Sequence, residues 1–328
     1  MTAPARAHGD VRTVLALRAL GLGDALTGVP ALRGLRRLWP DARLVLAAPE
    51  DVGSWLAGLG VVDAVLPAHG LAPLAPDALV ASAAEHPEVM GGQAVDVAVN
   101  LHGNGTASAV ALAALEPARV LAFASAVHPD GPAWRDDEHE VLRWCRLVQE
   151  AGGTCGPDDL VLREDDDRTG VVVVHPGAAS GSRRWPAERW ARVVAALRAQ
   201  GRDVVVTGSP DERGLCSAVA RDGARDLAGA LDLPELTDLV AGAALLLCGD
   251  TGVAHLATAT RTPSVLLFGP TPPQGWGPAV DADRHAVLWR APDGSYRGDP
   301  HGAQVDPVLA ATGVDDVLAA AGRVLGAA

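Results

Sequence analysis

The segment from residue 245 to residue 277 constrains the fold more than any other part of the chain. An apolar run at 245–248 leads into Gly-Asp-Thr-Gly at 249–252, and a helical sequence follows directly. A short apolar run that ends in a small-residue turn is typical of a buried strand in a parallel sheet. Such a turn points the free N–H groups and the positive dipole end of the next helix at one place. The segment therefore predicts an anion-binding turn that suits phosphate.

The same order of strand, glycine turn and helix opens the chain. A strand is predicted at 11–20, a glycine turn at 21–24, and a helix through the apolar residues Val29 to Leu38. Further strands are expected at 43–49, 61–67 and 95–103. Strands that alternate with helices predict a parallel sheet wound in right-handed crossovers.

The pattern begins again after the acidic, Gly- and Pro-containing stretch 154–170, which we interpret as an interdomain linker. The 328 residues suffice for two domains, predicted as 1–160 and 161–328. The expected fold class is α/β, with two doubly wound Rossmann-like domains facing a cleft. Ligands are expected beyond the carboxyl ends of the strands.

The composition excludes several functions. A formal net charge of −13 argues against a nucleic-acid partner. No apolar run approaches the roughly 20 residues that span a bilayer, and residues 1–10 lack the apolar core of a signal peptide. The expected location is cytoplasmic, with peripheral attachment at the inner face of the membrane as an alternative. The four cysteines contain no CxxC pair, and no His spacing fits a metal site, so we expect no metal.

Asp24 follows the first glycine turn and has two interpretations. As a helix N-cap, its carboxylate would accept backbone N–H groups. As a general base, it would take a proton from an attacking hydroxyl. The turn is not a dinucleotide fingerprint, because Leu26 stands where GxGxxG requires glycine.

A second phosphate-binding candidate is HPGAASGSRRWP at 175–186. Ser180 and Ser182 can donate to phosphate oxygens, and Arg183 and Arg184 can bind a diphosphate with two parallel hydrogen bonds. All 27 basic residues of the chain are arginine, so any role usually taken by lysine falls to arginine. A solvated arginine pair is the alternative. The serine spacing does not match the GxSxG turn of serine hydrolases.

Asp250, Thr251, Gly252 and His255 lie where the strand at 245–249 leaves the sheet and the next helix begins. His255 is four residues beyond Thr251, so the two share a helix face. We predict that these residues contact the ligand. The alternative for His255 is packing within the helix.

The ordered motifs resemble the ADP-heptose:lipopolysaccharide heptosyltransferases of glycosyltransferase family 9. The resemblance rests on LRALGLGDALTGVPALRGLRRLWPDA at 17–42, VDVAVNLHGN at 95–104, EHEVLRWCRLVQEAGG at 138–153, SRRWP at 182–186 and GDTGVAHLATA at 249–259. It covers nearly the whole chain.

The resemblance implies a GT-B fold with an N-terminal acceptor domain and a C-terminal donor domain, and it leaves open a last helix that packs back on the first domain. The implied reaction is inverting, metal-independent transfer of a heptose or related sugar, with an ADP-sugar as co-substrate and no other cofactor. Asp24 is the implied base. Arg183 stands where the family commonly has lysine. The implied site residues are, for the donor, Ser180, Ser182, Arg183, Arg184, Glu212 at the ribose, Leu233 at the adenine, Asp250, Thr251, Gly252 and His255, and for the acceptor, Gly23, His102, Asn104 and Arg143.

The acceptor is expected to be a glycan, a lipid-linked sugar or a small molecule. The first 120 residues contain few arginines, which predicts an acceptor other than the acidic lipopolysaccharide core. Two other functions stay open. A nucleotide-sugar epimerase of GT-B fold would act without an acceptor, and a non-catalytic sugar-nucleotide binding protein would tolerate the loss of Asp24.

Overall fold

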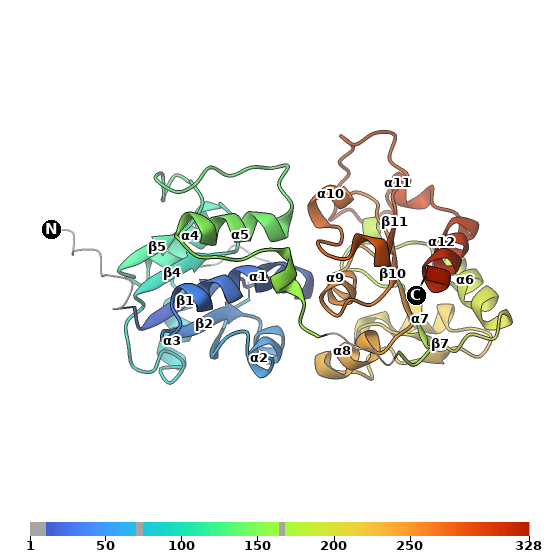
Figure 1. Ribbon diagram of the computed structural model, residues 1–328, viewed down its shortest axis with the longest axis horizontal. Coiled ribbons are helices and arrows are strands. Elements are labelled where there is room, and N and C mark those ends of the chain that lie inside the picture. Colours follow the sequence, from blue (N-terminus) through green and yellow to red (C-terminus); the bar gives the residue numbers. More distant parts are fainter. Residues whose placement is uncertain (1–10, 70–74, 164–167, 328) are drawn as a thin grey trace. The chain divides into compact units, whose positions relative to one another are not determined.

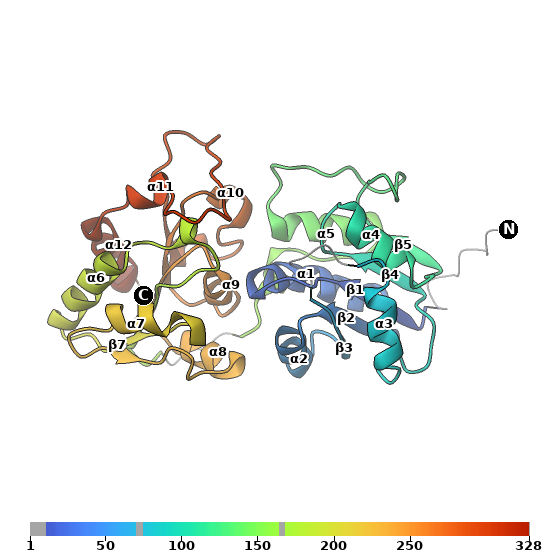
Figure 2. The ribbon, with the colours of Figure 1, turned by 180° about the vertical axis from the view of Figure 1, so that it is seen from behind.

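A computed structural model describes residues 11–69, 75–163 and 168–327 (Figures 1 and 2). The chain divides into two compact units, Met1–Leu160 and Val161–Ala328, each described here by itself. The division lies inside the predicted linker. Residues 164–167 of that linker, and residues 1–10 on which the signal-peptide expectation rests, lie outside the described part.

The first residues of the predicted linker belong to the N-terminal unit. The short 3-10 helix η2 (Pro157–Leu160) packs against the helix α1 (Leu22–Leu38), and Leu160 is 2% exposed. Asp159 pairs with Arg37 of α1 at 2.5 Å. The linker prediction is therefore wrong for this part, because an apolar anchor and an ion pair hold it on the unit.

The described residues of the N-terminal unit form a five-stranded parallel sheet in the order β3-β2-β1-β4-β5. Alternate residues of the central strands point to opposite faces of the sheet. Leu15, Leu17 and Val45 pack on one face with Leu79 and Leu112. The remaining elements are β1 (Thr13–Leu17), β2 (Arg43–Ala48), α2 (Glu50–Gly58), β3 (Ala64–Pro67), α3 (Ala78–Glu85), β4 (Val97–Asn100), α4 (Thr106–Ala113), β5 (Arg119–Leu121) and α5 (Glu140–Glu150).

The C-terminal unit has a six-stranded parallel sheet among its described residues, in the order β11-β10-β9-β6-β7-β8. The predicted return of the strand and helix pattern after residue 170 is confirmed. The elements are β6 (Val172–His175), η3 (Gly181–Arg183), α6 (Ala187–Ala199), β7 (Val204–Val206), η4 (Pro210–Glu212), α7 (Arg213–Val219), β8 (Arg225–Asp226), α8 (Leu233–Ala241), β9 (Leu245–Gly249), α9 (Gly252–Ala259), β10 (Ser264–Leu267), α10 (Pro273–Trp276), η5 (Ala282–Arg284), β11 (His285–Leu288), α11 (Pro307–Ala310) and α12 (Val314–Ala327).

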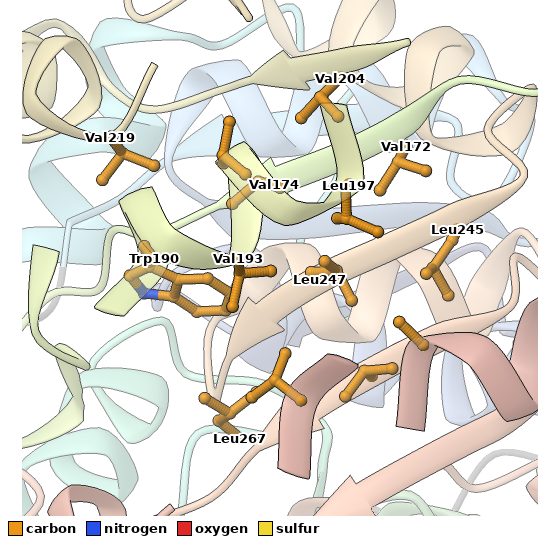
Figure 3. Packing of buried hydrophobic residues seen from close by; sticks show 14 of the residues in the cluster. Val172, Val174, Trp190, Val193, Leu197, Val204, Val219, Leu245, Leu247 and Leu267 are labelled. Atoms are coloured by element: carbon orange, nitrogen blue, oxygen red, sulfur yellow. The ribbon is translucent and has the colours of Figure 1, made fainter. Parts of the chain in front are cut away.

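One face of the C-terminal sheet holds the larger core cluster (Figure 3). Strand residues such as Val174 and Leu247 meet Trp190 and Val193 of α6. Trp190 is 1% exposed and packs edge-to-face with Trp185 at a centroid distance of 4.9 Å. This packing fixes the carboxyl ends of β6 and β9, from which the candidate site loops emerge.

The last helix, α12, packs within the C-terminal unit. It lies against α6 and against strands β9, β10 and β11. Val317, Ala320 and Ala321 are fully buried in the core cluster of that sheet. The resemblance left the place of this helix open, and the structure shows that its apolar face packs on its own unit.

His285 makes the stability of the C-terminal unit depend on pH. Burial lowers the pKa of His285 to about 4, and nearby Asp281 offsets this only in part. The unfolded chain takes up a proton near 6.5, so stability falls as the pH drops from about 6.5 to about 4. We expect urea-unfolding free energies of the wild type to fall more steeply than those of His285→Gln over this range, by up to about 1.4 kcal/mol per pH unit.

The control for this measurement is His86→Gln, because the His86 side chain is 39% exposed. Equal slopes for wild type and His285→Gln between pH 6.5 and 4 would contradict the prediction.

Candidate functional site

In each sheet the strand order reverses at one place, where successive strands stop being added on one side and are added on the other. The predicted site residues lie beside these two places. In the N-terminal sheet the reversal falls between β1 and β4, and in the C-terminal sheet between β6 and β9. Ligands of open parallel sheets bind beyond the carboxyl ends of strands at such switch points. The loops after β1 and β4, and after β6 and β9, are therefore the candidate sites of the two units.

Asp24 lies in the first turn of α1 and is not a helix cap. The N-cap is Gly21, and it makes no side-chain cap hydrogen bond. The Asp24 carboxylate instead contacts Arg18, at 3.3 Å from Oδ1 to Nη2, and its side chain is 31% exposed. The capping interpretation is therefore wrong. The general-base interpretation stays open, because the carboxylate is partly exposed and a substrate hydroxyl can reach it.

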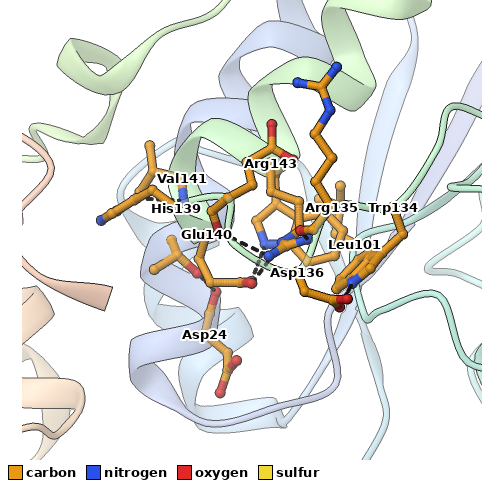
Figure 4. A network of polar contacts seen from close by, with 12 residues as sticks. Asp24, Leu101, Trp134, Arg135, Asp136, His139, Glu140, Val141 and Arg143 are labelled. Carbon is orange, nitrogen blue, oxygen red and sulfur yellow. Dashed lines mark hydrogen bonds and ion pairs between the residues drawn. The ribbon is translucent and has the colours of Figure 1, made fainter. Parts of the chain in front are cut away.

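Arg18 organises the surroundings of Asp24. It directly follows β1, is 2% exposed, and donates from Nε to the Asp24 carbonyl oxygen at 2.8 Å. Nη2 donates to Thr27 Oγ1 at 2.9 Å, and Nη1 donates to the Leu101 carbonyl oxygen. Glu140 of α5 lies 3.5 Å away, in the network drawn in Figure 4. We did not single out Arg18 from the sequence, although a charged residue directly after an apolar strand was a usable signal.

The predicted acceptor residues after β4 lie at the same switch point. Burial lowers the pKa of His102, and Arg18 lowers it further, while Asp24 raises it in part. His102 Nδ1 is buried and has no hydrogen-bond partner among the described residues. Asn104 is exposed, and Gly23 lies in the first turn of α1 beside Asp24. A neutral imidazole here can exchange hydrogen bonds with a hydroxyl group.

Arg143 was predicted to bind the acceptor, but the structure buries it. Its side chain donates from Nε to Glu140 at 2.8 Å and from Nη2 to the Glu138 carbonyl oxygen at 2.9 Å. The guanidinium also stacks on Trp134, 3.9 Å from the ring centroid. With 3% exposure and its donors used inside the protein, Arg143 supports α5 rather than a ligand. The amphipathic sequence of α5 did not indicate that Arg143 is buried.

The turn after β9 has the geometry predicted from its sequence. Thr251 is the N-cap of α9 in extended conformation, and its side chain makes no cap hydrogen bond. Asp250 is 5% exposed and Gly252 begins the helix. His255 is 7% exposed, with its ring 6.0 Å from that of Trp276. The helix N-terminus thus offers N–H groups at the switch point, while His255 is mostly packed.

The loop after β6 brings Arg183 to the same edge of the sheet. Arg183 Nη1 donates to the Asp250 carbonyl oxygen at 3.4 Å, and Nε donates to Ser180 Oγ at 3.3 Å. A Cβ added at Gly249 would lie 3.1 Å from the Arg183 carbonyl oxygen, so the two loops are in close contact. Arg183 is half-buried, and the structure places it with the 250–252 turn.

The two serines are held by the protein more than predicted. Ser180 Oγ donates to the Pro300 carbonyl oxygen and lies 3.2 Å from Ser182 Oγ. Ser182 is 2% exposed, and its backbone N–H donates to Gly302 at 2.8 Å. These contacts suit a support for Arg183 better than direct phosphate donors. No local sequence pattern indicates that residues 300–306 pack on this loop.

The other three predicted donor residues do not form one cluster. They are Arg184, Glu212 and Leu233. Arg184 is exposed, and its Nε donates to the Ala178 carbonyl oxygen at 2.8 Å. Glu212 Oε2 accepts from the Ser209 backbone N–H at 2.9 Å, and a Cβ added at Gly177 would meet Glu212 Oε1. Leu233 begins α8 and is half-buried. Glu212 is thus beside the loop after β6, where a ribose contact remains a prediction.

Within residues 11–69, 75–163 and 168–327, no group of three or more His, Cys, Asp or Glu side chains is arranged to hold a metal ion. Among the helices of that same part of the chain, none combines the length and hydrophobicity needed to cross a bilayer.

Comparisons with known proteins agree on one family. A family model described as glycosyltransferase family 9 (heptosyltransferase) matches residues 90–295. Lipopolysaccharide heptosyltransferase 3 of Escherichia coli is 27% identical over 92% of this chain and 96% of its own length. A glycosyl transferase family 9 structure from Veillonella parvula superposes with a TM-score of 0.78 at 19% identity, covering 97% and 98% of the two chains.

A further solved structure, ADP-heptose lps heptosyltransferase II of E. coli, superposes with a TM-score of 0.75 at 19% identity. It covers 96% of this chain and 99% of its own. At this identity the likeness concerns the fold. Together with the two parallel α/β sheets, it confirms the predicted GT-B fold.

Proposed function

The chain belongs to glycosyltransferase family 9, the heptosyltransferases, and on that premise we propose that it transfers a heptose from an ADP-activated donor to an acceptor hydroxyl. One observation carries the proposal most directly. The N-terminus of α9 and the Arg183 side chain meet at the switch point of the C-terminal sheet. This combination suits a diphosphate, because N–H dipoles and a guanidinium both stabilise its charge.

The proposed chemistry needs that charge stabilisation. When the anomeric bond to the donor breaks, negative charge builds up on the leaving diphosphate. Arg183 and the N–H groups at the start of α9 supply fixed positive charge for it. Arg183 stands where the resemblance leads one to expect lysine, and its planar guanidinium can bind two oxygens at once.

Asp24 is proposed as the general base. Its carboxylate is partly exposed, is not used as a cap, and has its orientation set by Arg18. It would accept the proton of the acceptor hydroxyl as the oxygen attacks the anomeric carbon. A single displacement of this kind inverts the anomeric configuration. Neither step assigns a role to a metal ion, and metal independence remains part of the proposal.

The acceptor is proposed to be a glycan that presents a neutral region to the site. The relatives are named for lipopolysaccharide, so its core is the first acceptor to test. The arginines of α1 already have protein partners: Arg33 donates to the Asp159 carbonyl oxygen, Arg36 pairs with Asp63, and Arg37 pairs with Asp159. Because these arginines are already paired, we expect the transfer rate to depend little on phosphate groups of the acceptor. Rates with dephosphorylated core acceptors would test this.

Calorimetric titration of ADP, UDP and GDP tests the donor assignment. We expect ADP to bind more tightly than UDP and GDP. A preference for UDP or GDP would keep the fold and overturn the ADP-heptose assignment. Absence of binding by all three would contradict the transferase proposal.

Arg183→Ala is expected to weaken ADP binding about 10-fold, because a hydrogen bond to a charged group contributes about 1.5 kcal/mol at a partly exposed site. The matched control is Arg225→Ala, whose exposed side chain pairs with Asp203 at 3.2 Å. Unchanged ADP affinity in Arg183→Ala would remove this residue from the donor site.

A further inference from the structure

We propose that Arg18 and Glu140 form a positioning pair that holds the Asp24 carboxylate and the loop after β4 in the arrangement needed for proton transfer. This inference rests on the proposed function, since it assigns a purpose to the geometry around the proposed base. Arg18 is named here as a positioning residue, because it acts through Asp24.

The first argument is the way that Arg18 holds both the backbone and the side chain of Asp24. Nε donates to the Asp24 carbonyl oxygen at 2.8 Å, and Nη2 lies 3.3 Å from Oδ1. Thr27 Oγ1 accepts from the same Nη2 and donates to the same carbonyl oxygen at 2.8 Å. One contact holds the Asp24 backbone and the other reaches its carboxylate, so a single rigid, planar group limits the positions that the carboxylate can take.

The second argument is that Arg18 also reaches the other side of the switch point. Nη1 donates to the carbonyl oxygen of Leu101, the residue directly before His102. One buried guanidinium therefore connects the first turn of α1 to the exit of β4. Asp24 and His102, the two groups proposed to meet the acceptor, are held relative to each other by this connection.

The third argument is the cost of burying this charge. Arg18 is 2% exposed, and a buried cation is tolerated only when it is paired and hydrogen-bonded. Glu140 Oε2 lies 3.5 Å from Nη2 and also accepts from Trp144 Nε1 at 3.0 Å. Glu140 Oε1 accepts from Arg143 at 2.8 Å (Figure 4). The positive charges of two arginines are therefore offset by the negative charges of Asp24 and Glu140.

The fourth argument is that the guanidinium is also confined by packing. Its Cζ lies 4.7 Å from the ring centroid of Trp144. A Cβ added at Gly28 of α1 would lie 3.9 Å from Arg18 Cγ and Nε, so the helix runs alongside the Arg18 side chain. Burial, ring stacking and hydrogen bonds on every nitrogen hold Arg18 in one orientation. Such preorganisation is what a site needs to present a base to its substrate.

The test compares Arg18→Met, Arg18→Lys and wild type in transfer from ADP-heptose, with kcat, donor KM, ADP affinity and thermal midpoint measured for each. We expect Arg18→Met to lower kcat roughly 20-fold, below the 10² that misplacement by about 1 Å can cost. Donor KM and ADP affinity should stay within about two-fold, because the donor residues lie in the other unit. Arg18→Lys should recover part of kcat, since it keeps the charge but cannot make all the hydrogen bonds.

Arg36→Met is the matched control, because Arg36 lies on α1, the helix that carries Asp24, and pairs with Asp63 at 31% side-chain exposure. Its kcat should match wild type. A folded Arg18→Met protein with wild-type kcat would overturn the inference. The inference would also be overturned if Arg18→Met and Arg18→Lys lost kcat equally and the loss simply tracked a lowered thermal midpoint.

If Arg18→Met does not fold, Arg18→Lys and Glu140→Gln decide the question. In both variants kcat is expected to fall by a larger factor than donor KM changes. Wild-type kcat in both would overturn the inference. A wild-type protein that transfers no sugar from ADP-heptose contradicts the proposed function itself. An active wild type with unaffected variants contradicts only the role of the pair.

Discussion

Asp24→Asn is expected to lower kcat about 10³-fold, within the range that a positioned general base contributes. The amide has nearly the shape of the carboxylate but cannot accept the hydroxyl proton, so the loss should appear in kcat. ADP affinity should be unchanged, because the residues proposed to bind the donor belong to the C-terminal unit. Steady-state kinetics and calorimetry on the same preparation measure both quantities.

Asp51→Asn provides the control for this variant. Asp51 also lies in the first turn of a helix, α2, and is exposed. Its substitution should leave kcat as in the wild type. An Asp24→Asn protein with more than about one tenth of the wild-type kcat would contradict the assignment of Asp24 as the base.

Gly181→Ala is expected to lower kcat/KM about 10²-fold, as displacement of a binding loop by about 1 Å can do. A Cβ at residue 181 would lie 1.9 Å from the backbone carbonyl oxygen of Ala303. Backbone cannot yield as a flexible side chain can, so the loop must move away from residues 300–306. That movement breaks the support of Ser180 for Arg183 and weakens ADP binding.

The matched control for the glycine is Gly214→Ala. A Cβ at Gly214, in α7, meets nothing within 4 Å, and alanine favours the helix by about 0.5–1 kcal/mol. Its activity should equal that of the wild type. If Gly181→Ala keeps wild-type ADP affinity and kcat/KM, the loop after β6 does not set the donor geometry.

Much of the fold could be predicted because the central strands are nearly continuous apolar runs. β1, β2, β6, β9 and β10 are buried on both faces, which leaves a plain sequence signal. β5 and β11 were not predicted, since they lie at sheet edges, are short, and mix polar with apolar residues. Edge strands bury less and so carry a weaker pattern.

The site was predictable where local turn geometry determines it. Thr251 and Gly252 begin α9 as their sequence indicates, because small residues there permit the strand-to-helix turn. Arg143 was assigned to the acceptor because its burial against Glu140 and Trp134 does not show in the helix sequence. Arg18 was missed because its role depends on Glu140 and Trp144. Those partners are distant from Arg18 in sequence, and no local pattern records such contacts.

The segment that supports Arg183 shows the same limit. Asp306 N–H donates to the Ser182 carbonyl oxygen at 3.1 Å, and Asp306 Oδ2 accepts from Tyr296 at 2.9 Å. The first of these contacts joins residues more than a hundred positions apart. Only the tertiary structure shows that this segment supports the loop that carries Arg183.

The central claim is that the chain moves a sugar from an ADP-activated donor to a hydroxyl acceptor. The most direct measurement follows ADP release and the sugar product from ADP-heptose, with and without a lipopolysaccharide core glycan, by NMR. We predict ADP release that depends on the acceptor and a product with inverted anomeric configuration. Conversion of the donor to an epimer or to free sugar at the same rate without any acceptor would contradict the claim.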